Sequence, residues 1–93
     1  MKIRYSPQAR SDLQEIFDYL DERSPSGAGN VMRAIYAGIQ FLADNPLASQ
    51  ETDLQEIRVK VVRRYNYKIF YRLDQDTIDL IHIRHAARAP FAV

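Results

Sequence analysis

The spacing of apolar residues along this chain changes once, close to Glu56, from a helical period to a period of two. Before Glu56, apolar residues recur at intervals of three and four, which predicts amphipathic helices. After Glu56, apolar and polar residues alternate, which predicts strands. Because the chain has only 93 residues, this single change predicts one α+β domain spanning 1–93, in which helices pack on a sheet.

Two helices are predicted in the first half of the chain. A short strand containing Ile3 and Tyr5 comes first, and Ser6-Pro7 then supplies an N-cap hydroxyl and a proline suited to the first helical turn. We expect this helix to end at the break Ser24-Pro25-Ser26-Gly27. The second helix is expected over about 28–44, because Asn45-Pro46 prevents its continuation.

Each predicted helix has one apolar stripe. In the first helix the stripe consists of Ala9, Leu13, Ile16, Phe17 and Leu20. Its solvent side is expected to consist of Arg10, Asp12, Gln14, Glu15 and Asp18. In the second helix the residues at helical spacing are Val31, Met32, Ile35, Ile39 and Leu42. The short loop between the two helices predicts a helical hairpin.

Three strands are predicted in the second half, after a connecting loop over 47–55 that has no apolar period. Residues 57–62 and 67–73 alternate, and a β-branched run over 77–84 follows the polar turn at 74–76. Short links between these runs favour an antiparallel meander. The predicted fold is therefore β-α-α-β-β-β, with the helical hairpin packed on one face of a small twisted antiparallel sheet and the other face open.

Composition narrows the chemistry that the chain can perform. The absence of cysteine excludes disulfides and thiolate zinc sites, so a metal site would need His82 and His85 with carboxylates. We expect neither a metal nor a cofactor. The beginning of the chain does not resemble a signal peptide, and no apolar run reaches membrane-spanning length, so we expect a cytoplasmic protein with no membrane partner.

The charges are distributed unevenly although the formal net charge is only +1. Five basic residues stand against eight acidic ones up to Asp53, and eight against four from Leu54 onward, which predicts an anionic partner for the second half. The polar sides of the two central strands would gather four cations on the open face, partly neutralised by Asp79. These cations are Arg58, Lys60, Lys68 and Arg72. The alternative is a solvated face whose like charges prevent edge-to-edge aggregation.

Several short motifs follow one another in a characteristic order. They are Tyr5-Ser6-Pro7-Gln8-Ala9 with Asp12-Leu13, Tyr19-Leu20 before Ser24-Pro25, Asn45-Pro46, Ile57-Arg58, Tyr67-Lys68-Ile69-Phe70-Tyr71-Arg72, and Ile83-Arg84-His85-Ala86-Ala87-Arg88-Ala89-Pro90. In this order the chain resembles, over nearly its whole length, the ParE/RelE toxin superfamily of bacterial type II toxin–antitoxin systems, and most closely its ParE branch.

The resemblance implies a toxin that causes growth arrest, serves in plasmid stabilisation and is held inactive in a hetero-oligomer with a cognate antitoxin. ParE-like toxins are regarded as DNA gyrase inhibitors, whereas RelE-like toxins cut messenger RNA in the ribosome. The first hypothesis is therefore a non-catalytic gyrase inhibitor, and the alternative is a metal-independent endoribonuclease. A third hypothesis is an inactive member that serves as an interaction module.

The candidate site residues differ between these hypotheses. A binding toxin would contact its target through Arg58, Lys60, Arg72, Arg84 and Arg88. A nuclease would use His85 or a tyrosine for proton transfer, and Arg58, Arg72 or Arg84 to hold the phosphate. No tyrosine follows Tyr71, which favours the ParE branch.

The two histidines and three of the tyrosines also have structural interpretations. His82 is expected to be a partly buried strand residue that shares a face with Ile78 and Leu80. His85 either transfers protons or satisfies backbone groups and braces the Arg88 tail. The three tyrosines of one strand parity are expected to pack in the sheet, and they are Tyr65, Tyr67 and Tyr71.

Overall fold

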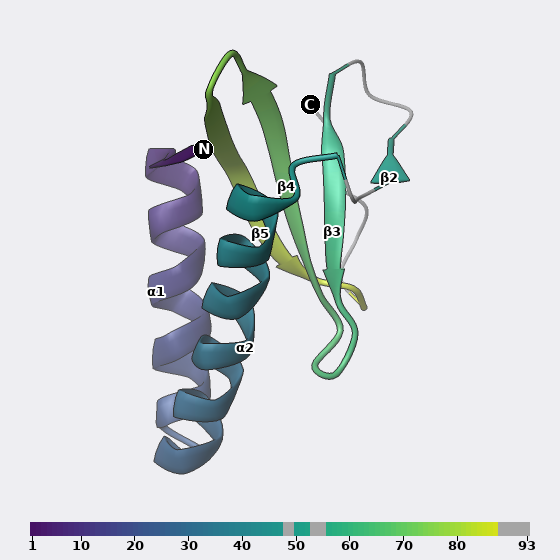
Figure 1. The fold of residues 1–93 in the computed structure, drawn as a ribbon. Coiled ribbons are helices and arrows are strands. Elements are labelled where there is room, and N and C mark those ends of the chain that lie inside the picture. The colour runs from purple at the N-terminus through teal and green to yellow at the C-terminus, as the bar shows by residue number, and fades with distance from the viewer. Residues whose placement is uncertain (48–49, 53–55, 88–93) are drawn as a thin grey trace.

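The computed structural model describes residues 1–47, 50–52 and 56–87, and its two helices cover one face of a five-stranded sheet (Figure 1). In chain order the elements are β1 (Lys2–Tyr5), α1 (Pro7–Asp21), α2 (Pro25–Asp44), β2 (Gln50–Glu51), β3 (Arg58–Val62), β4 (Tyr67–Asp74) and β5 (Thr77–His85). The predicted α+β class, with a helical hairpin on one face of the sheet, is confirmed. Within the described residues, neither helix is long and apolar enough to cross a membrane.

The strands lie in the order β1-β5-β4-β3-β2. The predicted antiparallel meander of β3, β4 and β5 is confirmed, but β1 pairs with β5 in parallel, so the sheet is mixed at this edge. Short links constrain only consecutive strands to run antiparallel. The first strand reaches the last one through the whole helical hairpin and the meander, a connection long enough for parallel pairing.

Two predicted boundaries were wrong. Gln50 and Glu51, expected in a loop, form the short strand β2 opposite Val59 and Arg58, because two residues are too few to show a period. Ser24-Pro25, expected to end the first helix, also begins α2. The Ser24 hydroxyl accepts a hydrogen bond from the Gly27 backbone N–H at 3.1 Å, and Pro25 opens the helix, so both helices start with the same serine–proline cap.

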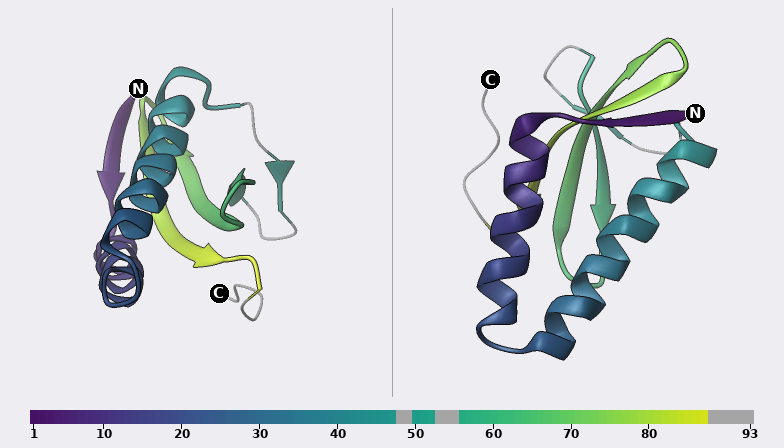
Figure 2. Two further views of the ribbon diagram at one scale, coloured as in Figure 1. Left: turned by 90° about the horizontal axis from the view of Figure 1, so that it is seen from below. Right: turned by 90° about the vertical axis from the view of Figure 1, so that its left-hand side faces the viewer.

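The hydrophobic core lies between the hairpin and the covered face of the sheet (Figure 2). Its largest fully buried side chains come from α2, β4 and β5: Ile35, Ile39, Leu42, Ile69, Tyr71, Ile78 and Leu80. Tyr67 and Tyr71 are buried, as the sheet-packing interpretation predicted, and the Tyr71 hydroxyl donates to the Pro46 carbonyl oxygen at 2.8 Å. The Tyr71 side chain is buried but keeps a hydrogen bond for its hydroxyl, so it holds β4 against the residues that follow α2.

The predicted solvent side of α1 was wrong at Asp12, and its predicted stripe was wrong at Phe17. Asp12 is only 6% exposed, whereas Phe17 is 38% exposed. Asp12 lies at three and four residues from Ala9 and Ile16, so it belongs by position to the inward stripe. The carboxylate is buried there because β5 supplies hydrogen-bond donors to it.

Candidate functional site

The pairing register of β3 with β4 decides which cations reach the uncovered face of the sheet. Arg58 lies opposite Tyr71 and Lys60 opposite Ile69. Since directly opposite residues share a face, and Tyr71 and Ile69 belong to the core, Arg58 and Lys60 lie on the helix side. The predicted gathering of Arg58, Lys60, Lys68 and Arg72 on one face is therefore wrong.

Contacts of the two β3 cations agree with this placement. An Arg58 guanidinium N–H donates to the Leu47 carbonyl oxygen at 3.3 Å, and the Lys60 ammonium lies 4.7 Å from the centre of the Phe41 ring in α2. The alternation in this strand was ambiguous because Val59, Val61 and Val62 are all apolar. Val62, opposite Tyr67, is the residue that becomes buried.

Three of the basic residues on the uncovered face, Lys68, Arg72 and Arg84, form what we call the cationic face. Lys68 and Arg84 are directly opposite each other in β4 and β5. Like charges at opposite positions destabilise a sheet, so an anionic partner would relieve this repulsion. Half-buried apolar side chains share this face with the cations, and they are Val59, Val61 and Phe70.

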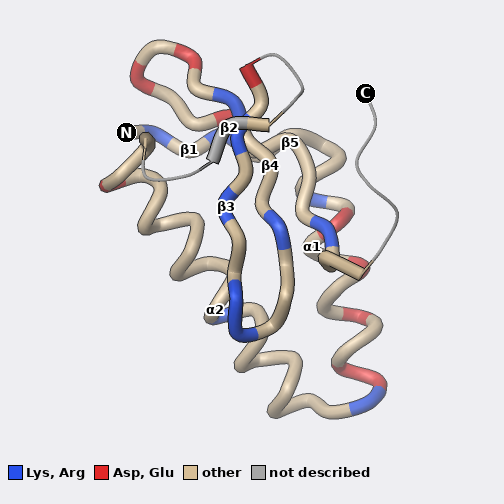
Figure 3. The backbone as a smooth tube through the Cα atoms, turned by 90° about the vertical axis from the view of Figure 1, so that its right-hand side faces the viewer, with Lys and Arg blue, Asp and Glu red and all other residues tan. Residues whose placement is uncertain are grey.

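Positive charge increases toward one end of the sheet. Exposed Arg63 and Arg64 lie in the β3–β4 turn, whereas acidic residues lie at the β4–β5 turn at the opposite end (Figure 3). Asp79 lies opposite Arg72, as expected for partial neutralisation, and its carboxylate accepts a hydrogen bond from the Arg4 Nε at 2.5 Å. The end of the sheet near the β3–β4 turn is therefore the more electropositive one.

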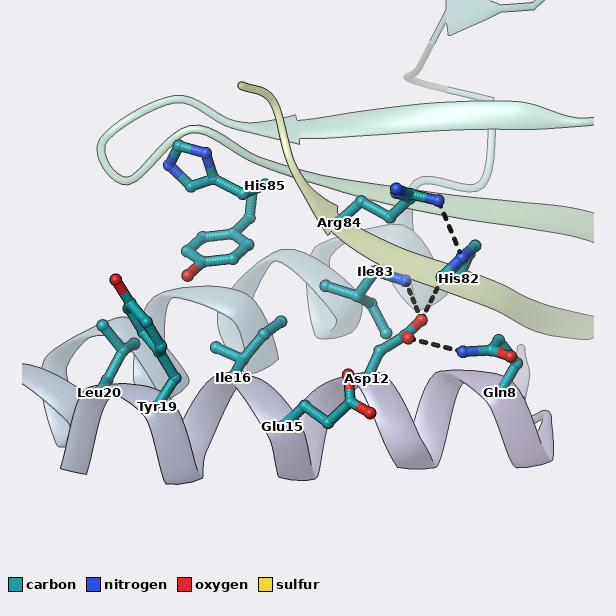
Figure 4. Close-up of a pocket in the computed structure, with 11 residues that line it drawn as sticks. Gln8, Asp12, Glu15, Ile16, Tyr19, Leu20, His82, Ile83, Arg84 and His85 are labelled. Atoms are coloured by element: carbon teal, nitrogen blue, oxygen red, sulfur yellow. Dashed lines mark hydrogen bonds and ion pairs between the residues drawn. The ribbon is translucent and has the colours of Figure 1, made fainter. Parts of the chain in front are cut away.

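A groove of about 540 Å³ lies between α1 and the last part of β5 (Figure 4). β1 pairs with β5 only as far as Leu80, so the edge of β5 beyond Leu80 has no neighbouring strand. Groups from the start of α1 take over its hydrogen bonding: the Ser6 hydroxyl donates to the Ile81 carbonyl at 3.1 Å, and Asp12 accepts from the Ile83 N–H at 2.9 Å. The side chains of Ser6 and Asp12 thus supply hydrogen bonds that a neighbouring strand would otherwise make with β5.

Asp12 is the centre of a buried polar cluster in this groove (Figure 4). Besides the Ile83 N–H, its carboxylate accepts from the Gln8 amide at 2.8 Å and contacts His82 Nδ1. Arg84 Nη1 lies 3.4 Å from His82 Nε2. A guanidinium can only donate, so His82 Nε2 accepts from Arg84, and Nδ1–H donates to Asp12. This chain of contacts orients Arg84.

The structural interpretation of His82 agrees with these contacts, but its predicted face was wrong. Ile81 has no partner in β4, because the register shifts between Phe70 and Tyr71. This irregularity places His82 opposite Phe70, whereas Leu80 lies opposite Tyr71. One unpaired residue therefore reverses the side of the sheet on which the following residues lie.

His85 lines the far part of the same groove. Its Nδ1 accepts from the Ala87 backbone N–H at 3.2 Å, and its ring meets the Tyr67 ring edge-on, with centroids 5.1 Å apart. The backbone-satisfying interpretation of His85 matches this geometry. Because the Nδ1 lone pair already accepts a hydrogen bond, a role as general base requires this contact to break.

Comparison with known proteins identifies the family. The family described as "ParE toxin of type II toxin-antitoxin system, parDE" matches residues 3–90. The chain belongs to the ParE toxin family. A Sinorhizobium fredii protein named "Putative toxin Y4kP" is 27% identical over 85 residues, which cover 91% of this chain and 88% of that protein.

Two solved structures share the fold of this ParE-family toxin. The chromosomal ParDE toxin–antitoxin system of P. aeruginosa contains a chain with a TM-score of 0.80 at 19% identity, covering 91% of this chain and 95% of that chain. The toxin–antitoxin complex RelBE2 of Mycobacterium tuberculosis contains one with a TM-score of 0.59 at 21% identity, covering 90% and 95%. The fold is therefore common to structures of both ParE and RelE systems.

The candidate residues of this ParE-family toxin are only partly brought together. Arg72 and Arg84 lie on the cationic face, and Arg84 also lines one groove with His85. Arg58 and Lys60 lie on the helix side. Arg88 falls outside the described residues. Among residues 1–47, 50–52 and 56–87, no group of three or more His, Cys, Asp or Glu side chains could hold a metal ion.

Sequence reasoning missed Asp12 and the pair Arg63 and Arg64 as site residues. The signal for Asp12 was its position within the apolar stripe of α1, where a carboxylate requires buried donors. The signal for the two arginines was their place in a turn at the end of a hairpin, where side chains extend into solvent.

Proposed function

We propose that this ParE-family toxin acts by binding, that its target is DNA gyrase, and that a cognate antitoxin neutralises it in the cytoplasm. The observation that supports binding most is the pair of opposed cations, Lys68 and Arg84, on the sheet face that the helices leave uncovered. Such a face, with half-buried apolar residues between basic ones, suits an anionic or amphipathic macromolecular surface.

The same face explains how the antitoxin and the target would exclude each other. An acidic amphipathic segment of the antitoxin would cover the cations and Phe70 together, and so would a target surface. Toxin bound to antitoxin would then form a hetero-oligomer in which the cationic face is not accessible. Release of the antitoxin would restore target binding.

The distribution of candidate residues supports binding over catalysis. Phosphodiester cleavage without metal needs a base, an acid and a cation at one point. Here Arg58 and Arg72 lie on opposite faces, and the Nδ1 of His85 accepts from the chain's own backbone. A binding toxin needs no such convergence.

Ribosome-dependent cleavage of messenger RNA is the alternative function. It is favoured by one observation: Arg84, His85 and Tyr67 line the same groove, which places a guanidinium, an imidazole and a phenol near one another. In this mechanism Arg84 would hold the phosphate, and His85 would move a proton.

The direct test measures supercoiling by purified gyrase in the presence of the isolated toxin. We expect inhibition by the native chain, and a loss of at least about tenfold in potency for the double variant Lys68→Gln/Arg84→Gln, which removes two charges from the contact. Arg23→Gln is the matched control, because Arg23 lies in the loop between the helices. Full potency of the double variant would reject the cationic face as the contact.

A test in cells separates the alternatives. Induced expression without antitoxin should produce chromosome breaks while messenger RNA stays intact. Rapid cleavage of messenger RNA with intact DNA, abolished by His85→Gln, would establish the nuclease instead. If neither occurs while antitoxin binding persists, the chain is an interaction module. Arg88→Ala should abolish toxicity and spare antitoxin affinity if the segment after Ala87 contacts the target.

A further inference from the structure

The turn between β3 and β4 lies in a strongly basic stretch of the chain. Residues 57–73, which contain β3, this turn and most of β4, include six Lys or Arg residues and no Asp or Glu. Two of the six, Arg63 and Arg64, lie in the turn itself, and both are exposed. We call this pair the basic turn. Figure 3 shows it at the end of the sheet opposite the acidic β4–β5 turn.

Two further cations connect the basic turn to the cationic face. Lys68 is the second residue of β4, directly after the turn, and it lies opposite Arg84 in β5. Within the described part of the chain, Arg63, Arg64 and Lys68 form no ion pair with a carboxylate. The described residues therefore leave the positive charge at this end of the sheet without a neutralising partner.

Hydrogen bonds fix the conformation of the turn before any partner binds. The Tyr65 backbone N–H donates to the Val62 carbonyl oxygen at 3.3 Å, and the Ala86 N–H donates to the Asn66 carbonyl oxygen at 2.6 Å. Asn66 has a φ of 59°, in the left-handed region that asparagine adopts more readily than most residues. A turn held in this way loses little backbone entropy when its side chains bind a partner.

The surface around the basic turn combines charge with little exposed apolar area. Among residues 57–87, all of which the structure describes, no large apolar side chain is exposed. Tyr65, the aromatic residue of the turn, is half-buried, and the Arg64 guanidinium lies 5.5 Å from the centre of its ring. Protein–protein interfaces usually have an apolar core, whereas protein–DNA interfaces are more polar and much more positively charged. The basic turn therefore suits a nucleic acid better than a protein.

The same features favour a duplex over a single strand. Single-stranded nucleic acids are bound largely by stacking of their bases on aromatic side chains, and the one aromatic ring of the turn is not exposed. A DNA duplex carries about one phosphate charge per 1.7 Å of its axis. The planar guanidinium of arginine matches two phosphate oxygens with two parallel N–H donors. Charged contacts without stacking thus suit the backbone of a duplex.

We propose that the basic turn binds the phosphate backbone of double-stranded DNA. Arg63 and Arg64 would each contact a phosphate, and Lys68 and Arg84 would add contacts along the cationic face. The choice of DNA over RNA rests on the proposed function, because gyrase acts on duplex DNA. In that setting the toxin would contact the bound DNA as well as the enzyme, and its affinity for the enzyme–DNA complex would exceed that for the free enzyme.

The test measures binding of the purified chain to a fluorescein-labelled DNA duplex of mixed sequence, about two helical turns long, in the absence of gyrase. Fluorescence anisotropy gives the association constant at a series of salt concentrations. Three or four phosphate contacts predict that its logarithm falls with the logarithm of the salt concentration with a slope of about −3. Amide NMR shifts should be confined to the β3–β4 turn, the start of β4 and the end of β5.

Variants separate the basic turn from the overall charge of the chain. The double variant Arg63→Gln/Arg64→Gln should weaken DNA binding at least about tenfold at low salt and make the slope less steep by about 2, because two phosphate contacts are lost. Arg63→Lys/Arg64→Lys should keep most of the affinity, since both charges remain.

The matched control is Arg10→Gln/Arg23→Gln, which makes the same change in net charge within α1 and in the loop that follows it. It should leave the slope unchanged, because neither residue belongs to the proposed contact. All four arginines are exposed, so the variants should unfold at the urea midpoint of the native chain.

Several outcomes would overturn the inference. These are no measurable binding of duplex DNA at low salt, an equal loss of affinity in the control variant, tighter binding of single-stranded DNA or duplex RNA of the same length, and equal binding of a polyglutamate peptide. Inhibition of gyrase by a chain that does not bind DNA would reject this inference and leave the proposed function standing. DNA binding by a chain that does not inhibit gyrase would do the reverse.

Discussion

Individual residues stabilise this fold where α1 meets the end of β5. The carboxylate of Asp12 replaces the strand that β5 lacks beyond Leu80, and it also holds the His82 ring that contacts Arg84. Asp12 therefore affects both the stability of the fold and the geometry of the candidate site, because its buried carboxylate fixes the backbone of β5 and, through His82, the direction of the Arg84 side chain.

Replacing Asp12 with alanine should lower the free energy of unfolding by about 2–4 kcal/mol, because the buried Ile83 N–H and the His82 ring lose their acceptor. Asp18→Ala is the control: Asp18 is exposed, and within the described part of the chain its carboxylate is bonded only to Gln14, so its loss should cost less than about 0.5 kcal/mol. Urea unfolding measures both. Similar losses for the two variants would contradict the role given to Asp12.

A second residue-scale prediction concerns pH. A hydrogen bond from Arg4 lowers the pKa of Asp79 below its ordinary value of 3.8. The Asp79 carboxyl therefore binds its proton at a higher pH in the unfolded chain than in the folded chain. The stabilisation that the pair with Arg4 gives to the fold is complete above the unfolded pKa of Asp79 and is lost as the pH falls through its folded pKa. Asp79→Asn should lower the melting temperature at neutral pH, and the difference from the native chain should shrink as the solution is acidified.

The measurement is a series of thermal unfolding curves from about pH 7 to about pH 2, a range that spans the titration of Asp79. Arg4→Gln should reproduce most of the effect, and adding it to Asp79→Asn should change little, because the two residues share one interaction. A difference that stays constant at all pH values would show that the ion pair is not linked to folding.

At the scale of elements, both helices begin with serine and proline, but the two cap hydroxyls form different hydrogen bonds. Ser24 is exposed, and its hydroxyl accepts from the Gly27 N–H of its own helix and lies near Ser26. The Ser6 hydroxyl accepts from the Ala9 N–H and also donates to the Ile81 carbonyl in the irregular part of β5. The first cap therefore joins a helix to the sheet as well as starting it.

Ser6→Ala should accordingly destabilise the chain by about 1–2 kcal/mol, whereas Ser24→Ala should cost about 0.5–1 kcal/mol, the usual value of an exposed cap. Free energies of unfolding by denaturant compare the two variants under the same conditions. A larger loss at Ser24 would show that the hydrogen bond from Ser6 to β5 contributes little.

For the whole molecule, the sheet is most strongly held at its centre and more weakly at one edge. β4 pairs with β3 on one side and β5 on the other, and the helices cover its buried residues. β2 is paired with β3 at two positions only.

Amide hydrogen exchange should reflect this arrangement. We expect the slowest exchange at hydrogen-bonded amides of β4, with opening free energies close to that of global unfolding, and the fastest exchange among strands in β2. Native-state exchange followed by NMR provides the comparison. Protection of β2 equal to that of β4 would contradict the picture of a weak edge.

Local sequence signals were sufficient to predict every element of this protein except the two-residue strand β2. Serine–proline caps, apolar spacing and short polar turns act over a few residues, so they indicated two helices and the β3–β4–β5 meander, and the order of motifs indicated the family. They could not show that Asp12 would be buried, because the donors that stabilise its charge come from β5, about seventy residues away in the chain.

Tertiary structure alone decided which side chains share a surface. Successive side chains of a strand point to opposite faces, so the unpaired Ile81 moves every following side chain of β5 to the other face. In β3, the run of valines left it ambiguous which residues of the strand would face the helices. Arg58 and Lys60 were assigned to the wrong side for this reason, while Lys68 and Arg72 were assigned correctly. The sequence by itself determined both helices, the longer strands and their order. Strand register, which depends on contacts between distant residues, determined the site.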